Sequence, residues 1–114
     1  MNKELIPHVF ASLQSLERYV DIIKSSLESS DHTGNELRAM VPQYETTLKK
    51  MRRTANKLQF QVAADNQQQI IRSLRIFYGL NHMVRPEILS SFLSLSKGSK
   101  TVGSVTPEAV ASFH

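Results

Sequence analysis

The sequence contains no cysteine among its 114 residues, and aromatic residues make up only 7% of it. The lack of cysteine excludes disulfide bonds, thiolate metal sites and a cysteine nucleophile, so the fold must be held by packing. The chain also lacks an uninterrupted apolar run near the ~18 residues that a membrane-spanning helix needs. Pro7 and His8 interrupt the apolar residues that follow the N-terminus, which argues against a signal peptide. We therefore expect a soluble, cytoplasmic, single-domain protein.

Charge is spread unevenly along the chain. The net charge is +4, but residues 1–47 hold four cations against seven carboxylates, whereas residues 48–114 hold ten cations against three carboxylates. A net charge this small does not by itself indicate nucleic-acid binding. The asymmetry predicts attraction within the chain or to a charged partner.

Proline and glycine divide the chain into helical segments, because proline favours the first helical position and glycine favours the position just past the end. This punctuation predicts helices near 7–29, 42–78, 86–96 and 107–113, and a flexible tail over 97–114. Two alternatives stay open. Asn2 or Asn35 could cap helices that begin earlier, which would place Pro7 or Pro42 inside a helix. The polar stretch 64–69 lacks Gly and Pro, so we expect a continuous helix there, with a hinge as the alternative.

Two apolar seams are the strongest signal in the sequence. Both have the alternating three- and four-residue spacing that keeps one line of side chains facing another helix. Because a short polar loop joins them, they predict an antiparallel helical hairpin. The first seam consists of Ile6, Val9, Leu13, Leu16, Val20, Ile23 and Leu27, and the second of Leu37, Val41, Tyr44, Leu48, Met51, Ala55, Leu58 and Val62.

The hairpin leaves further apolar residues without a partner, since the second predicted helix extends beyond the first. The third segment can fold back over this overhang, and any part that stays exposed becomes an interaction site. The alternative is that these residues simply complete a three-helix core. The candidate partner-binding residues are Ile70, Leu74, Phe77, Ile88, Leu89, Phe92 and Leu93.

Catalytic or metal chemistry finds no support in the residue pattern. The four histidines, His8, His32, His82 and His114, lie far apart in the sequence, and none has a second histidine at the spacing that would put both on one helical face. A phosphotransfer role for His82 is disfavoured by the residues that follow it. We expect no enzyme activity, no cofactor and no metal.

The densest cationic cluster lies on the second predicted helix, at Lys49, Lys50, Arg53 and Lys57. These positions point away from the seam, whereas Arg52 lies beside it. An outward basic patch can bind a phosphate backbone or an acidic protein surface, or it can simply be solvated. Few aromatic residues accompany it, which argues against base stacking and makes nucleic-acid binding the less favoured function.

The order of elements resembles a known family. The chain is similar to flagellar type III export chaperones of hook-filament junction proteins. The shared features are a long heptad hairpin, a helix rich in Leu, Arg and Gln, the sequence Leu80-Asn81-His82 leading into Ile88-Leu89, and a loose Gly/Ser-containing tail. The family commonly has Asn-Gly where this chain has Val84-Arg85-Pro86, and it is usually acidic. The resemblance implies a holdase that binds an amphipathic helix of its client in a helix-in-groove contact.

These observations predict an all-α protein, in which residues 1–96 form a coiled-coil-like hairpin closed by a shorter third helix and residues 97–114 form a tail. Its expected function is to bind a protein partner through helix packing, as an export-type chaperone. One alternative is a structural subunit that self-associates into a homodimer or larger coiled assembly. The other is a small nucleic-acid-binding protein that uses the basic patch.

Overall fold

The computed structural model describes residues 2–29 and 35–101, and within these ranges the fold consists of helices alone. A short 3-10 turn, Asn2–Glu4, leads into α1 (Leu5–Ser29), which is followed by α2 (Asn35–Ala63) and α3 (Gln67–Thr101). The predicted all-α fold is confirmed. The helix expected at 107–113 lies outside the described residues.

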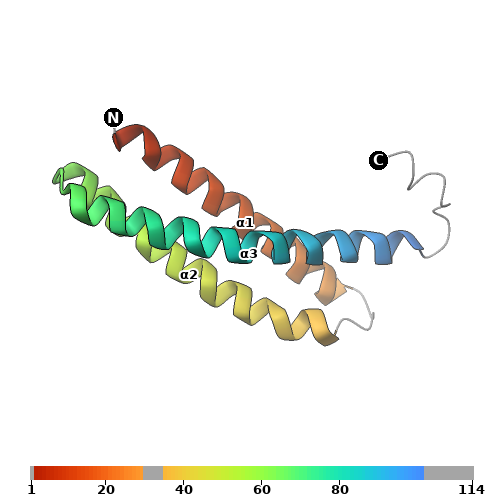
Figure 1. The fold of residues 1–114 in the computed structure, drawn as a ribbon. Coiled ribbons are helices and arrows are strands. Elements are labelled where there is room, and N and C mark those ends of the chain that lie inside the picture. The colour runs from red at the N-terminus through yellow and green to blue at the C-terminus, as the bar shows by residue number, and fades with distance from the viewer. Residues whose placement is uncertain (1, 30–34, 102–114) are drawn as a thin grey trace.

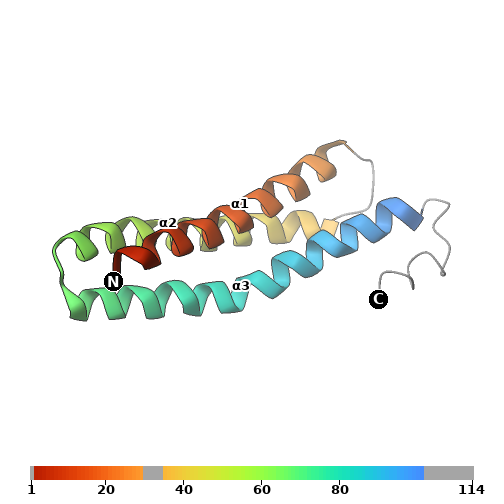
Figure 2. The same cartoon turned by 90° about the horizontal axis from the view of Figure 1, so that it is seen from above.

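The three helices run up, down and up along one long axis (Figure 1). The Cα atoms span 55 × 30 × 18 Å. The α2–α3 connection and the N-terminus lie at one end of the bundle in both views (Figures 1 and 2). The end of α1 and the start of α2 lie at the other end, so α1 and α3 are parallel and α2 is antiparallel to both. This layout closes the predicted hairpin with a long third helix.

Both predicted seams lie in the core. Val9, Leu13 and Leu16 of α1 and Met51 and Leu58 of α2 are fully buried. The residues at the ends of the seams, such as Ile6 and Val62, are half-buried and pack against this core. Heptad spacing predicted these contacts correctly because each seam brings its apolar side chains onto one stripe of its helix.

The prediction of one continuous helix over 42–78 is wrong, because α2 ends at Ala63 and the chain turns over residues 64–66. Asp65 has a φ of 54°, in the left-handed region. The amide of Asp65 donates to the Val62 carbonyl and that of Asn66 to the Gln61 carbonyl, both at 3.0 Å, the bond pattern of a Schellman motif. Asp and Asn tolerate the left-handed conformation better than most residues, so this helix end needs no glycine.

The next helix begins at the same turn. The side-chain oxygen of Asn66 accepts a hydrogen bond from the Gln69 amide at 3.3 Å, which is the geometry of a helix N-cap. Asp65 and Asn66 thus end one helix and begin the next. The alternative prediction, a hinge within the polar stretch 64–69, therefore gave the correct location of the break. The break is a full reversal of the chain direction.

The predicted break between 78 and 86 is also absent, because α3 continues through Gly79 and Pro86. Figure 2 shows α3 changing direction part-way along, and proline within a helix removes one backbone hydrogen bond and bends it. Residues 97–101, expected in the tail, continue α3 as well. α2 begins at Asn35 and contains Pro42 within the helix. This agrees with the alternative prediction in which Asn35 caps a helix that begins before Pro42.

A third seam explains why α3 is continuous. It has the same four- and three-residue spacing as the other two, but Asn81 and Ser91 occupy two of its positions and disguise it in the sequence. Burial along the whole seam outweighs a helical glycine, which costs about 1 kcal/mol. The seam consists of Ile70, Leu74, Phe77, Asn81, Val84, Ile88, Ser91 and Leu95.

Candidate protein-binding face

Polar contacts fix the position of α3 against the hairpin. The Tyr44 hydroxyl of α2 lies 2.7 Å from the buried Ser91 hydroxyl and donates to the Glu87 carbonyl at 3.2 Å. At the other end of α2, the Ser73 hydroxyl donates to the Gln61 side chain at 2.6 Å. Every buried side-chain polar atom in the described part of the chain has a hydrogen-bond partner. Such contacts specify one register, because a shift of α3 would leave buried polar groups unpaired.

Two further contacts hold α3 against α1. The Ser12 hydroxyl donates to the Asn81 side-chain oxygen at 3.2 Å, which satisfies a polar residue in the third seam. Two turns further along α1, the Tyr19 and Phe92 rings meet edge to face with their centroids 4.9 Å apart. Phe92 therefore contributes to the packing of the bundle with part of its surface.

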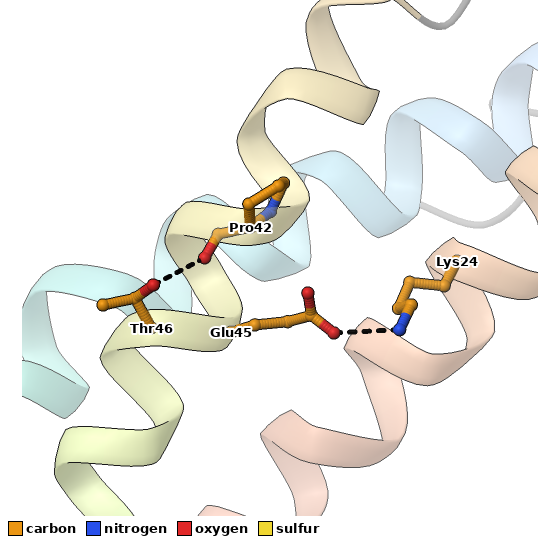
Figure 3. A network of polar contacts seen from close by, with 4 residues as sticks. All are labelled: Lys24, Pro42, Glu45 and Thr46. Atoms are coloured by element: carbon orange, nitrogen blue, oxygen red, sulfur yellow. Dashed lines mark hydrogen bonds and ion pairs between the residues drawn. The ribbon is translucent and has the colours of Figure 1, made fainter.

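Two ion pairs join α1 to α2. Arg52 donates to both carboxylate oxygens of Glu17, at 2.7 and 2.9 Å, and its guanidinium lies 5.9 Å from the Phe10 ring centroid. Lys24 lies 2.9 Å from a Glu45 carboxylate oxygen (Figure 3). Hydrogen bonds to these carboxylates raise the pKa of both cations above their usual values. The Glu17–Arg52 pair joins the acidic first part of the chain to the basic second part, as the charge distribution predicted, whereas Lys24 and Glu45 both lie in the first part.

The structure divides the seven candidate partner-binding residues by exposure. Ile70, Phe77 and Ile88 are fully buried inside the bundle, and Leu74, Leu89 and Phe92 are half-buried. Leu93 is 57% exposed and is the one candidate whose side chain is mostly free to meet a partner. Most of the seven residues therefore complete the three-helix core, which is the alternative that the sequence left open.

Four further apolar residues of α3, which were not among the predicted candidates, are exposed together with Leu93. Seven large hydrophobic side chains are exposed in the described part of the chain, and five of them belong to this helix. The largest exposed fractions on α3 are those of Met83 at 70% and Leu93 at 57%. Exposed apolar side chains gathered on one element indicate an interaction site. The five are Ile71, Ile76, Tyr78, Met83 and Leu93.

Ile76, Gly79 and Met83 follow one another at three- and four-residue intervals, so they form one stripe along the outside of α3. A Cβ atom placed on Gly79 would meet nothing within 4 Å. The helix backbone is therefore accessible between two exposed apolar side chains. We call Ile76, Gly79 and Met83 the α3 outer stripe. A signal for it was present in the sequence, as two apolar residues seven positions apart with glycine between them.

The predicted basic patch is exposed. Lys49, Lys50, Arg53 and Lys57 all lie on the solvent side of α2, and none has an ion-pair partner among the described residues. Phe60, 77% exposed, lies one turn beyond Lys57 on the same side of the helix. Over residues 46–86 the chain has eight cations and one carboxylate. The half of the bundle next to the α2–α3 turn is therefore strongly basic.

Two of the histidines lie in the described part of the chain. His8 on α1 and His82 on α3 are both exposed, and the described residues contain no group of three His, Asp or Glu side chains placed to hold a metal ion. None of the three helices, over the residues that the structure describes, has an apolar stretch long enough to cross a membrane.

No protein-family model, curated protein or solved structure significantly matches the chain. The exposed faces of the bundle, above all the α3 outer stripe and the basic patch, are therefore the features that bear on function.

Proposed function

We propose that this protein is a non-enzymatic binding protein that holds an amphipathic helix of a partner protein against α3. The observation that supports the proposal is the gathering of exposed apolar side chains on that helix, five of the seven in the described chain. The bundle already buries its own three seams, so these side chains remain available for a fourth helix. An amphipathic helix matches such a surface with apolar residues at every third or fourth position.

Within this proposal the partner is a client of an export system, and the protein acts as a cytoplasmic chaperone that keeps the client helix covered. The resemblance of the sequence to hook-filament junction chaperones supports this more specific assignment. Covering an apolar helix prevents it from associating with other exposed apolar surfaces before export.

A labelled peptide of three heptads tests the binding function. Its seam positions are leucine and its other positions are glutamine and serine, so that it is amphipathic and uncharged; a scrambled peptide of the same composition is the control. We expect the amphipathic peptide to raise fluorescence anisotropy on titration with the protein and the scrambled peptide not to do so. Replacing Ile76 and Met83 together by serine should weaken binding by about tenfold, the equivalent of 1.4 kcal/mol of lost apolar contact.

Phe60→Ser is the matched control variant, because it removes an exposed apolar side chain from α2 instead of α3. This variant should bind the uncharged peptide as the original chain does. Equal affinity for the amphipathic and scrambled peptides, or equal losses in the α2 and α3 variants, would contradict the proposal.

Self-association through the same stripe is the competing function. Light scattering at several concentrations separates the two. A stable dimer that dissociates when Met83 is replaced by lysine would identify a structural subunit and overturn the chaperone proposal, whereas a monomer at micromolar concentration supports it.

A further inference from the structure

We propose that the partner helix is acidic, and that it lies over α2 and α3 together with its carboxylates facing Lys50 and Lys57 and its apolar side on the α3 outer stripe. This inference rests on the proposed function and specifies the chemistry of the partner. The observation behind it is the register of α2 against α3, which places exposed cations and exposed apolar side chains at the same levels of the bundle.

The hydrogen bond between Gln61 and Ser73 fixes that register, because it places the two residues opposite each other in antiparallel helices. Four residues back along α2 is Lys57, and four residues forward along α3 is Phe77, the neighbour of Ile76. Seven residues further back along α2 is Lys50, and seven residues further forward along α3 is Val84, the neighbour of Met83. Lys57 is thus level with Ile76, and Lys50 is level with Met83.

The pair of Tyr44 and Ser91 gives the same register from the other end of the contact, to within one residue. Seven residues of helix rise by about 10 Å. The two lysines are therefore separated by about the same distance along the bundle as the two apolar side chains. A straight partner helix with a heptad repeat can therefore contact both lysines and both apolar side chains at the same time.

The heptad positions also place these residues on one face. Gln61 and Ser73 meet across the α2–α3 contact, and Thr54 and Leu80 occupy the same heptad positions one repeat further along α2 and α3. On a helical wheel of α2, Lys50 and Lys57 come next to Thr54 and Gln61. On a helical wheel of α3, Ile76 and Met83 come next to Ser73 and Leu80. The four residues flank the α2–α3 contact on its solvent side. We call Lys50, Lys57, Ile76 and Met83 the α2–α3 face.

Charge complementarity selects the acidic partner. Eight cations and the single carboxylate of Asp65 occupy residues 46–86, and the ion pair with Glu17 engages Arg52 on the α1 side of α2. Lys50 and Lys57 therefore belong to a region of net positive charge, bordered by Glu45 and Glu87, that repels a basic helix and attracts an acidic one. A bare phosphate backbone would match the lysines but would leave Ile76 and Met83 exposed to water. An acidic amphipathic helix covers both.

Gly79 adds a steric condition, because it lies between Ile76 and Met83 in open space. A helix that packs closely on the outer stripe needs this position to be small. In Gly79→Leu the added Cβ atom would meet nothing within 4 Å, and leucine is a better helix former than glycine. The variant should keep or raise the melting temperature and lose binding.

The test uses the complete chain and two peptides that share the leucine seam described above. One carries glutamate beside the seam and the other carries lysine at the same positions. At low ionic strength we expect the acidic peptide to bind about tenfold more tightly than the basic one, and the difference to shrink in 1 M salt, where the Debye length falls to about 3 Å. In the Lys50→Glu/Lys57→Glu variant the preference should reverse.

The matched control variant is Arg18→Glu/Lys49→Glu, which changes the net charge equally at exposed positions of α1 and of the α1 side of α2. It should retain the preference for the acidic peptide, reduced only by the change in overall charge. If both double variants lose the preference equally, the net charge of the molecule selects the partner and the proposed α2–α3 face does not.

The outcomes separate the inference from the proposed function. Equal binding of both charged peptides, with loss in the Ile76→Ser/Met83→Ser variant, would overturn the acidic partner and leave the helix-binding function standing. Binding of neither peptide would overturn both. Salt-dependent binding of a duplex oligonucleotide that depends on Lys50 and Lys57, without binding of the acidic peptide, would replace the partner with a nucleic acid. Preference for the acidic peptide, reversed by Lys50→Glu/Lys57→Glu and lost in Gly79→Leu, supports the inference.

Discussion

Removing the Tyr44 hydroxyl tests whether polar contacts fix α3 on the hairpin. Tyr44 is 2% exposed, so Tyr44→Phe keeps the packing of the ring and removes only the hydroxyl that reaches Ser91 and the Glu87 carbonyl. A net hydrogen bond contributes about 0.5–1.5 kcal/mol to stability. In the variant, the Ser91 hydroxyl can turn toward the Glu87 carbonyl four residues earlier in its own helix, so it is not left unpaired.

We therefore expect Tyr44→Phe to lower the free energy of unfolding by about 1 kcal/mol, which is ~4 °C in melting temperature for a domain of this size. Ser91→Ala should cost less, because the Tyr44 hydroxyl keeps its bond to the Glu87 carbonyl. The double variant should cost less than the two single changes together, with a coupling of about 0.5–1 kcal/mol.

Urea denaturation followed by far-UV circular dichroism measures all four proteins, and unchanged m-values show that the denatured states are comparable. Tyr78→Phe is the control, because Tyr78 is exposed on α3, and it should change stability by less than about 0.5 kcal/mol. The reasoning is refuted if Tyr44→Phe costs no more than the control, or if the two single changes are additive within about 0.3 kcal/mol.

Three further outcomes follow from the described contacts. Met51→Ala should lower the free energy of unfolding by about 2–5 kcal/mol, because Met51 is fully buried, whereas Met83→Ala should change it by less than about 0.5 kcal/mol; chemical denaturation compares the two. Asn66→Ala should cost about 1 kcal/mol through loss of the N-cap of α3, and Asn66→Asp, which keeps an acceptor oxygen, should recover most of it in thermal melts. The Glu45 carboxylate raises the pKa of Lys24, so the ion pair contributes to the free energy of unfolding below the usual lysine pKa of ~10.4. This contribution is lost as pH rises through the folded-state pKa of Lys24. Denaturation between pH 7 and pH 12 should therefore show a smaller loss of stability at alkaline pH in Lys24→Gln than in the original chain.

The location of the break between α2 and α3 shows where sequence reasoning reached its limit. The positions of glycine and proline predict helix ends near 79 and 86, yet the chain reverses at Asp65 and Asn66 and continues as a helix through Gly79 and Pro86. Asp65 holds a left-handed conformation that glycine adopts more easily, and the Asn66 cap begins the next helix. Asp-Asn is a weak signal in a sequence, because both residues are also common on solvated helix faces.

The candidate site was predicted only in part. The basic patch was identified correctly as exposed, since four cations on the side opposite an apolar seam must face solvent. The apolar candidates were mostly core residues, because hydrophobicity alone does not distinguish a side chain that meets its own bundle from one that meets a partner. The spacing of Ile76 and Met83 puts them on one stripe already in the sequence, but only the placement of the third seam shows that this stripe is exposed.

The sequence by itself determined that α1 and α2 pair through two heptad seams, because that pattern is local to each helix and needs only a facing partner. It also determined the acidic and basic halves of the chain. Only the tertiary structure decided which side of α3 is buried, because Asn81 and Ser91 look like interruptions until Ser12 and Tyr44 provide their hydrogen bonds. The exposed face of α3, and with it the proposed partner surface, follows from those contacts between helices distant in sequence.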